Sequence, residues 1–360
     1  MPLQLKEIED TEIEEVVSFH NLSYGDKRTP REWIWEYKGN YPDLFIFTII
    51  MDDGKVVGTQ GIIPIFLSVG GETHLSGKSE NSLLDPKYRG GGRFKKLYDF
   101  AMTLCEARKM RCVWGFTSAV KVWRNKLGFS VYEDAMYIST LVLRPRQFII
   151  SIRRSRQNTA KKMAKSLAVM VLYLYSRARR LIHKCLKRTS RKISIERRLR
   201  SASDVRELYK RLRVKYPDLI HIEQNEKYVA WRICRNPNVE YTTFFAYEGT
   251  LLKAYCYVAL TQNREAYLSD LTFEDSTAGS VLLETIVDLF CKRKIASICF
   301  MGNIRNPLMA NVFSLLKKNG FTKKNSTPFV LKNISFPHGQ CLYDIRNWYL
   351  NGLWTEGYQF

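Results

Sequence analysis

The sequence predicts an α/β protein in which two tandem copies of one fold are joined by a basic helical segment, each copy being a mixed, mostly antiparallel sheet flanked by helices. Three observations support this fold class. Strand-like and helix-like stretches alternate through residues 1–143, and the alternation returns after residue 200. Short motifs recur at separations of 192 and 196 residues. The residues between the two copies hold most of the net positive charge.

The first copy opens with a helix and a strand pair. Thr11 and Glu14 have the spacing of a capping box, ahead of an apolar-periodic run that ends near His20. The β-rich runs 45–51 and 55–66 are joined at Asp52-Asp53-Gly54, whose Asp-Gly step is a strong hairpin signal. These two runs are therefore expected to pair antiparallel.

A strand, a glycine turn and a helix come next. A β-rich stretch runs to Leu84, glycines interrupt it, and residues 94–109 place apolar side chains at helical spacing. Residues 112–116 predict a short buried strand, 119–126 a short helix, and 131–143 a closing strand or hairpin. Strands and helices are thus interleaved throughout the first copy.

An internal repeat supports the tandem arrangement. Trp35-Glu-Tyr-Lys-Gly-Asn-Tyr-Pro precedes one strand pair, and Trp231-Arg-Ile-Cys-Arg-Asn-Pro precedes another. Lys126-Leu-Gly-Phe129 follows one short helix as Lys318-Asn-Gly-Phe321 follows its counterpart. Nearly equal offsets favour duplication over chance.

Composition agrees with two cores and a basic connection. We expect a first domain at 1–143, a basic amphipathic helical linker or insertion at 144–200, and a degenerate second copy at 201–360. A chain of 360 residues exceeds what one core usually organises, and 45% apolar residues argue against general disorder. Residues 141–200 hold 19 Lys and Arg against one acid, Glu196, which gives +18 of the net +22. Such a concentration suggests an anionic partner.

The cysteines and the N-terminus suggest an intracellular protein without a metal site. Eight scattered cysteines include no CxxC pair and no His/Cys cluster at zinc-ligand spacing, so they are expected to be buried thiols. The start, MPLQLKEIED, has no apolar stretch after a positive region, so no signal peptide is indicated and the cytoplasm is expected. His20 and His74 lack partners at catalytic spacing.

The stretch that begins at Glu80 carries the clearest chemical signal. It reads Glu-Asn-Ser-Leu-Leu-Asp-Pro-Lys-Tyr-Arg-Gly-Gly-Gly-Arg-Phe-Lys-Lys-Leu, a strand that enters a glycine turn and then a helix. Three glycines let successive backbone N–H groups point into one concavity at a helix N-terminus, where the helix dipole adds positive potential. Arg89 and Arg93 reinforce that potential. The turn is a candidate pyrophosphate site, with a flexible basic turn as the alternative.

Leu84-Asp-Pro-Lys-Tyr-Arg89-Gly-Gly-Gly92 resembles the Q/R-x-x-G-x-G/A segment of GNAT acyltransferases with its preceding strand, and Trp114-Gly-Phe with Lys126-Leu-Gly-Phe129 resembles the next strand and turn of that family. The resemblance implies the GNAT fold and an acyl-CoA donor, either acetyl-CoA or another acyl-CoA. The pantetheine would pair with the backbone at Ser82, Leu83 and Leu84. The pyrophosphate would be held by the amides of Arg89, Gly90, Gly91, Gly92, Arg93 and Phe94. Phe94 stands where the family has Gly or Ala, so its amide is expected to be less accessible.

Acyl transfer also needs proton acceptors and donors. Only a neutral amine attacks a thioester, and a nearby carboxylate can accept the proton that the amine loses. Glu80 is the candidate catalytic residue, because several sugar-directed GNAT enzymes place a carboxylate at this position; a structural Glu is the alternative. Many relatives protonate the leaving thiolate with a tyrosine at the position of Arg124, and arginine cannot act as an acid near neutral pH. The remaining candidates for the acid are Tyr88, Tyr132, Ser118 and water.

Two further regions bear on the acceptor and on the second copy. Trp33, Trp35 and Tyr37 stand where the resemblance places one wall of an acceptor pocket, with core packing as the alternative. The stretch 270–280, which matches the glycine turn, carries acids in place of Arg and Gly. Because these acids would repel a pyrophosphate, we expect the second copy to bind no CoA and to shape or close the acceptor site.

The basic segment suggests a membrane surface. Residues 158–188 contain an apolar stretch at 167–175 with Lys and Arg on both sides. Nine apolar residues are too few to span a bilayer, which needs about 20 in a helix. The pattern fits interfacial binding to anionic lipid. A solvated helix packed across the two domains and an RNA-binding arm are the alternatives.

These features predict an N-acyltransferase that moves an acetyl or other acyl group from acyl-CoA to a primary amine, in the cytoplasm and peripheral at the inner face of the membrane. An amino sugar used in cell-surface polysaccharide assembly suits that location. The alternative is a non-enzymatic or Fem-type tandem GNAT-like protein that binds tRNA or membrane through its basic segment. Nucleic acid ranks below membrane, because the segment lacks the regular aromatic interleaving of single-strand binders.

Overall fold

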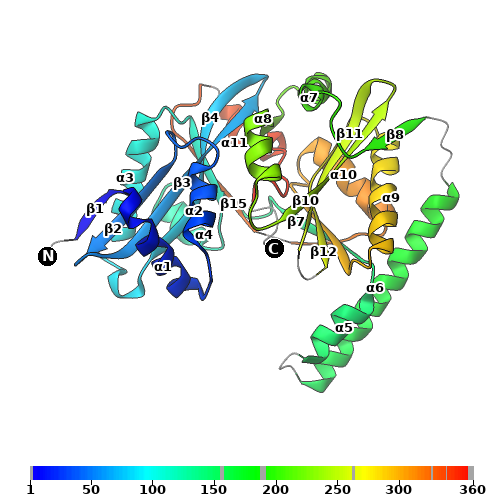
Figure 1. The fold of residues 1–360 in the computed structure, drawn as a ribbon, viewed down its shortest axis with the longest axis horizontal. Coiled ribbons are helices and arrows are strands. Elements are labelled where there is room, and N and C mark those ends of the chain that lie inside the picture. The colour runs from blue at the N-terminus through cyan, green and yellow to red at the C-terminus, as the bar shows by residue number, and fades with distance from the viewer. Residues whose placement is uncertain are drawn as a thin grey trace. The chain divides into compact units, whose positions relative to one another are not determined.

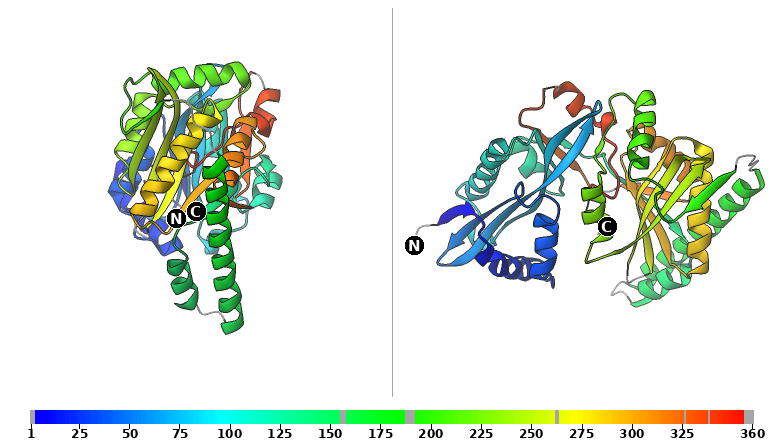
Figure 2. Two further views of the ribbon diagram at one scale, coloured as in Figure 1. Left: turned by 90° about the vertical axis from the view of Figure 1, so that its right-hand side faces the viewer. Right: turned by 45° about the horizontal axis from the view of Figure 1, so that its top comes forward.

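The computed structural model describes residues 3–154, 158–186, 192–261, 264–325, 327–337 and 339–355. The chain divides into two compact units, each built around one sheet (Figures 1 and 2). Unit 1 comprises Met1–Glu133, Ile220–Asn238 and Thr327–Asn347, and unit 2 comprises Asp134–Leu219, Val239–Ser326 and Trp348–Phe360. Both sheets are mixed, mostly antiparallel and flanked by helices, which confirms the predicted fold class.

In the described part of unit 1, the strand order is β1-β2-β3-β4-β5-β15-β6, with β9 added on β3. The strands are β1 (Gln4–Glu7), β2 (Ile46–Asp52), β3 (Lys55–Val69), β4 (Glu72–Leu84), β5 (Cys112–Phe116), β6 (Ser130–Tyr132), β9 (Ile220–Ile222) and β15 (Phe329–Asn333). The helices are α1 (Ile13–Tyr24), α2 (Pro30–Lys38), α3 (Arg93–Ala107), α4 (Val120–Asn125), α8 (Glu226–Val229) and α11 (Gly339–Tyr343).

Local predictions in unit 1 have mixed outcomes. The hairpin is confirmed, because β2 and β3 pair antiparallel and the turn residues Asp53 and Gly54 both have positive φ. The predicted capping box at Thr11 and Glu14 is wrong. Glu9 and Glu12 form the reciprocal cap instead, around a short 3₁₀ turn that precedes α1.

Unit 2 repeats the element order of unit 1. Its described strand order is β14-β7-β13-β12-β11-β10-β8. The strands are β7 (Tyr137–Val142), β8 (Ile193–Glu196), β10 (Glu240–Glu248), β11 (Leu251–Leu260), β12 (Glu265–Phe273), β13 (Ser297–Gly302) and β14 (Thr322–Asn325). The helices are α5 (Pro145–Arg154), α6 (Thr159–Leu186), α7 (Asp204–Lys215), α9 (Ser276–Lys292) and α10 (Pro307–Lys318). The run β10-β11-β12-α9-β13-α10-β14 follows the same sequence of elements as β2-β3-β4-α3-β5-α4-β6, as a duplication requires.

Two equivalent strands are exchanged between the sheets, in addition to β9, which the first sheet also takes from the second half of the sequence. β7 follows β6 in the chain but lies between β13 and β14. Conversely, β15 follows β14 in the chain but lies between β5 and β6. The compact units therefore do not coincide with the expected segments 1–143 and 201–360.

The repeat is also visible in a reciprocal contact inside unit 1. The indole Nε1 of Trp35 donates to the carbonyl of Trp231 at 3.1 Å, and the indole of Trp231 donates to the carbonyl of Trp35 at 2.7 Å. The two rings lie 5.8 Å apart. The two tryptophans that mark the sequence repeat therefore contact each other within unit 1.

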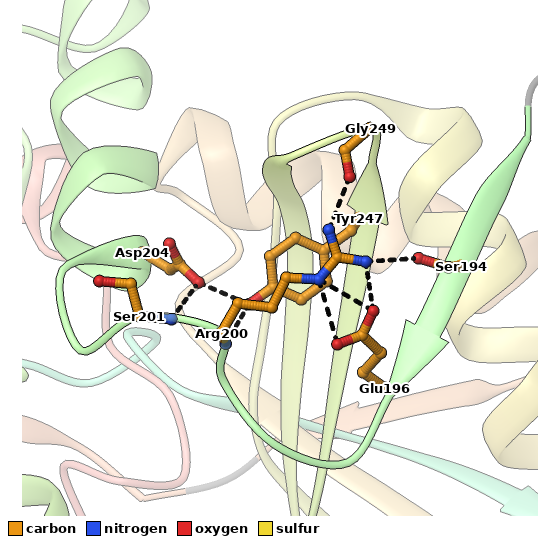
Figure 3. A network of polar contacts seen from close by, with 7 residues as sticks. All are labelled: Ser194, Glu196, Arg200, Ser201, Asp204, Tyr247 and Gly249. Atoms are coloured by element: carbon orange, nitrogen blue, oxygen red, sulfur yellow. Dashed lines mark hydrogen bonds and ion pairs between the residues drawn. The ribbon is translucent and has the colours of Figure 1, made fainter.

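The expected linker 144–200 consists of α5, α6 and then β8, which pairs with the edge of β10. Residues 187–188 of the predicted lipid-binding segment lie outside the described residues. Just after β8, Arg200 donates to Glu196 and to the Gly249 carbonyl at 2.8 Å, and its guanidinium lies over the ring of Tyr247 at 4.2 Å (Figure 3). The end of the segment is therefore part of the second sheet.

Candidate functional site

The candidate site begins where two parallel strands separate. β4 and β5 pair only at Gly77 and Lys78. The strands are still close at Gly115, where an added Cβ would lie 3.1 Å from the Ser79 carbonyl oxygen. Beyond this point a cavity of about 800 Å³ opens within unit 1. Its lining comes from the end of β4, the glycine turn, the start of α3 and the β5–α4 connection, and includes Ser79–Leu84, Arg89, Gly90, Gly92–Lys95, Phe116–Ala119, Val122, Trp123 and Lys126, together with Tyr24 and Thr327.

A β-bulge shapes the β4 wall of this cavity. Glu80 pairs with Gly61 and Leu83 with Thr59, so β4 carries one extra residue between these pairs. Asn81 occupies the bulge with φ +50, and its side-chain amide donates to the Tyr37 hydroxyl. Sequence reasoning missed this bulge, although Asn tolerates the left-handed conformation better than most residues do.

A buried hydrogen-bond network fixes the same strand edge. The Gln60 side-chain amide donates to Ser79 Oγ at 3.0 Å, and the Ser82 hydroxyl donates to Gln60 Oε1. The Tyr98 hydroxyl also donates to Ser79 Oγ, at 3.1 Å. Burial raises the pKa of Tyr98 well above its usual value, so this hydroxyl stays protonated and remains a donor near neutral pH. The backbone of β4 is thereby held in place beside the cavity.

The glycine turn leaves backbone donors free. Gly90, Gly91 and Gly92 all have positive φ, at +101, +58 and +72 respectively, which L side chains rarely adopt. Gly92 is the N-cap of α3, and the backbone bonds of the turn are Arg93 N–H to the Gly90 carbonyl and Lys96 N–H to the Gly92 carbonyl. Within the described residues, the amides of the three glycines donate to no other backbone group. They are therefore available to an anion at the positive end of the helix.

Positive charge surrounds the turn. The Arg89 guanidinium donates to the Leu84 carbonyl at 3.3 Å, and that of Arg93 donates to the Tyr88 carbonyl at 3.4 Å. Each guanidinium therefore contacts the backbone beside the turn, and Arg89 also remains exposed. Lys95 and Lys126 add two more cations to the lining, against the single carboxylate of Glu80.

Nearly all residues predicted from the glycine motif meet at this cavity. The lining includes Glu80, Ser82, Leu83, Leu84, Arg89, Gly90, Gly92, Arg93 and Phe94. Gly91 lies in the same turn but is not part of the lining. The half-buried Phe94 ring packs against the apolar cluster that contains Leu84 and Leu97. The ring therefore forms part of the cavity wall.

Glu80 has a partner that the sequence did not indicate. Its carboxylate forms an ion pair with Lys78, whose side chain is 5% exposed against 23% for Glu80. The carboxylate thus faces the cavity on one side and compensates a buried ammonium on the other. This contact gives Glu80 a structural role, and its role as proton acceptor stays a prediction.

Residues 4–132 match the family model described as an acetyltransferase (GNAT) domain. These residues are a GNAT domain. The whole chain is similar in structure to a GCN5-related N-acetyltransferase from Kribbella flavida, with TM-score 0.59, 11% identity, and coverage of 93% of this chain and 71% of that one. A GCN5-related N-acetyltransferase from Anabaena variabilis gives TM-score 0.58 at 11% identity, with coverage of 92% and 73%. A tandem GNAT protein from the clavulanic acid biosynthesis pathway gives TM-score 0.54 at 13% identity, with coverage of 93% and 99%.

At such identities the likeness to solved structures concerns the fold, and it extends the tandem GNAT fold over both units. No curated protein sequence matches the chain. The expected GNAT resemblance is confirmed. GNAT domains generally take their acyl group from acyl-CoA, which fits an open, cation-lined turn at the start of α3.

The three hydroxyl candidates for the general acid, Tyr88, Tyr132 and Ser118, have different surroundings in the GNAT domain. The Tyr88 hydroxyl donates to Asp52 at 2.5 Å, and that of Tyr132 donates to the Tyr343 carbonyl at 2.7 Å. The hydrogen bond to Asp52 raises the pKa of Tyr88, and burial raises the pKa of Tyr132 to about 12. Of the three hydroxyls, Ser118 lines the cavity.

The aromatic residues before β2 are mostly core. In the GNAT domain, Trp33 and Tyr37 are fully buried, so the core-packing alternative holds for them. Tyr24 of α1 instead lines the cavity, and the ring of His20, one turn earlier, packs against it at a tilt with ring centroids 4.8 Å apart. Burial and the nearby Arg28 lower the pKa of His20. Sequence reasoning set His20 aside, because its neighbours come from other elements and leave no spacing signal.

In unit 2 a chain segment occupies the place that corresponds to this cavity. β12 and β13 pair in parallel at Glu265–Leu268 and then part, as β4 and β5 do. The chain segment Trp348–Trp354 fills the space. The Leu353 amide donates to the Ser269 carbonyl at 3.1 Å, and the Asn303 amide donates to the Leu350 carbonyl at 3.0 Å.

The helix start that follows β12 is also occupied. Asp275 caps α9, accepting from the amides of Thr277 at 2.9 Å and Ala278 at 3.0 Å. Glu274 beside it is paired with Arg211 and Lys253. The donors that remain free in the glycine turn of the GNAT domain are therefore satisfied internally in unit 2.

Proposed function

We propose that this protein is an acyl-CoA-dependent N-acyltransferase whose GNAT domain moves an acetyl or other short acyl group to a primary amine. The observation that carries the proposal is the glycine turn at the start of α3, with free amides and four cations beside a cavity of about 800 Å³. A thioester lying along the β4 edge at Ser82–Leu84 would place its diphosphate at this turn.

The chemistry assigns each proton a destination. The lone pair of the neutral amine attacks the thioester carbonyl carbon, the C–S bond breaks, and the thiolate leaves with the bonding pair. The nitrogen then loses one proton, which Glu80 accepts directly or through one water. The departing thiolate takes a proton from solvent or through the Ser118 hydroxyl, which lines the same cavity.

For the acceptor, we propose an amino sugar of the kind used in cell-surface polysaccharide assembly. The support for this class is indirect, because it comes from the basic segment, which favours a location at an anionic membrane. The acceptor would approach the thioester past Tyr24 and the β4 bulge, where the lining is free of the cations that hold the diphosphate.

The test is mass spectrometry of CoA-dependent acylation across amino sugars, amino acids and peptides. We expect one class of amine to gain acyl mass, and we expect Glu80→Gln to slow the reaction. Glu106→Gln, on the exposed face of α3, is the matched control and should keep full rate. Equal rates in both variants would remove Glu80 from the mechanism. Acylation of no amine, together with no protection by acetyl-CoA against thermal unfolding, would refute the acyltransferase.

A second candidate is a non-enzymatic or Fem-type tandem GNAT-like protein. The observation that favours it is Arg124, which stands where many relatives have the acid and pairs with Glu133 at 2.7 Å, outside the cavity lining. Salt-sensitive retention on tRNA without binding of acetyl-CoA would support this candidate over the enzyme.

A further inference from the structure

α6 presents an apolar face to solvent. Six of its apolar side chains are more than half exposed, and each lies three, four, seven or eight residues from another, which places them on one side of the helix. They are Met163 (69%), Leu167 (67%), Val171 (56%), Leu174 (60%), Leu181 (60%) and Ile182 (53%). The face runs for about 30 Å along the helix.

The opposite side of α6 is the one that packs on unit 2. Ser176 is 1% exposed, and its hydroxyl donates to the Gly320 carbonyl at 2.7 Å. A side chain on Gly320 would meet the Ser176 backbone at 2.7 Å, so this contact is close. Ser176 is two residues from Leu174, which is about 200° around the helix. The apolar face is therefore turned away from the unit, and Figures 1 and 2 show α5 and the first half of α6 extending beyond the rest of it.

The hairpin of α5 and α6 is strongly basic. Residues 145–186 contain 11 Lys and Arg and no Asp or Glu. Lys161, Arg177 and Arg179 border the apolar face at helical spacing and are exposed or half-buried. An exposed aliphatic face with a basic border is the pattern of a helix that lies in the surface of an anionic bilayer. No helix in the described ranges is long and apolar enough to cross one.

A pocket lined by arginines opens at one edge of this face. It measures about 550 Å³ and is lined by Leu143, Arg144, Pro145, Arg146, Tyr173, Arg177, Arg180, Leu181 and Cys291. Four of these residues are arginines and none is an acid. Arg144 donates to the Cys291 carbonyl at 3.4 Å, and Arg180 to its sulfur at 3.6 Å, so the partners are neutral. Arg180 Nε is buried without a hydrogen-bond partner among the described residues.

We infer that α6 docks on an anionic phospholipid surface through its apolar face, and that the arginine pocket takes the phosphate of a lipid head group. Leu181 belongs to both the face and the pocket, so one lipid would place its chains along the helix and its phosphate beside Arg177 and Arg180. Within the described residues no carboxylate offsets the charge of these arginines, so it is available to a phosphate. RNA would gain nothing from six exposed aliphatic side chains, and a second copy of this face would carry the same positive charge.

The test uses the full chain and co-sedimentation with vesicles of phosphatidylcholine, with or without phosphatidylglycerol. We expect retention on the anionic vesicles that weakens as salt rises. Leu167→Ser with Leu174→Ser should weaken it about a hundredfold, and Arg177→Gln with Arg180→Gln about fivefold per arginine. The matched controls are Val214→Ser and Lys215→Gln on α7 of the same unit, both exposed, and these should bind like the unaltered chain.

Circular dichroism and thermal unfolding of each variant separate lost binding from lost fold. Equal retention on neutral and anionic vesicles would overturn the inference. Variants of the apolar face and of the arginine pocket that bind like the controls would overturn it as well. If the vesicles retain no protein, two other results would also overturn the inference. One is a dimer that the leucine variants convert to monomer, and the other is retention on tRNA that the leucine variants do not weaken. Because this inference rests on unit 2 alone, it stands or falls separately from acyl transfer.

Discussion

Gly92→Asp should abolish most of the affinity for acyl-CoA while leaving the fold intact. Gly92 is the N-cap of α3 and lines the cavity, and a Cβ built on it meets nothing within 4 Å. The new side chain therefore causes no clash. Asp at φ +72 costs about 1 kcal/mol of backbone strain. A carboxylate at a helix N-terminus returns part of that cost.

The loss of binding follows from Coulomb repulsion. A carboxylate about 5 Å from one diphosphate charge is repelled by about 1 kcal/mol at the dielectric constant of water and about 3 kcal/mol at an effective value of about 20. A middle value of about 2 kcal/mol weakens binding about thirtyfold. At an acetyl-CoA concentration that gives the unaltered protein about 2.7 kcal/mol of added stability, the variant should gain only about 0.9 kcal/mol.

The assay is thermal unfolding with and without acetyl-CoA, and the chain offers a close control. Gly54 in the β2–β3 turn has φ +75 and is equally open, so Gly54→Asp carries the same strain and the same charge away from the cavity. We expect the control to keep its full acetyl-CoA shift. The reasoning is refuted if the two variants respond alike to acetyl-CoA, or if Gly92→Asp binds it as tightly as the unaltered chain.

Three further predictions follow from the same geometry. Calorimetric titration should give one acetyl-CoA per chain, since Trp348–Trp354 and Asp275 occupy the equivalent space of unit 2; two sites would contradict this. Glu80→Ala should lower the free energy of unfolding, measured in urea, by about 3 kcal/mol, because it leaves the buried Lys78 ammonium without its partner. Lys78→Met should lower it by less, because the Glu80 carboxylate is more exposed. The reverse order would contradict this prediction. Burial and Arg28 lower the pKa of His20, and Asp26 partly offsets this shift. The stabilisation that neutral His20 gives the fold is therefore full above its unfolded pKa of about 6.5, and it is lost as the pH falls through the lower folded pKa. Urea titrations between pH 7 and 5 should show a smaller decline in His20→Asn, and an unchanged decline would count against it.

The strand, glycine turn and helix around Arg89 could be predicted from sequence because each is specified locally. Three glycines at positive φ, a hairpin at Asp53-Gly54 and an apolar period in α3 need no knowledge of distant residues. The tandem repeat was likewise readable, since Trp35 and Trp231 are marked by similar neighbours.

The remaining features depend on contacts between distant parts of the chain. β7 and β15 are short apolar strands that would satisfy the open edge of either sheet, so composition does not indicate which sheet takes which strand. The β4 bulge depends on the Tyr37 hydroxyl, and the Glu80 carboxylate meets Lys78 only once the strand exists. The outward face of α6 becomes visible only when Ser176 fixes which side packs.

The exchange of β7 and β15 makes the two halves of the polypeptide obligate partners. Cut between α5 and α6, the first piece would retain β7 but lack β15 and β9, and the second would retain those two but lack β7. Each fragment expressed alone would expose an unfilled sheet edge and aggregate, whereas co-expressed fragments would restore both sheets. The two fragments should therefore complement each other, so that either fragment is recovered in soluble form only when the other is also present.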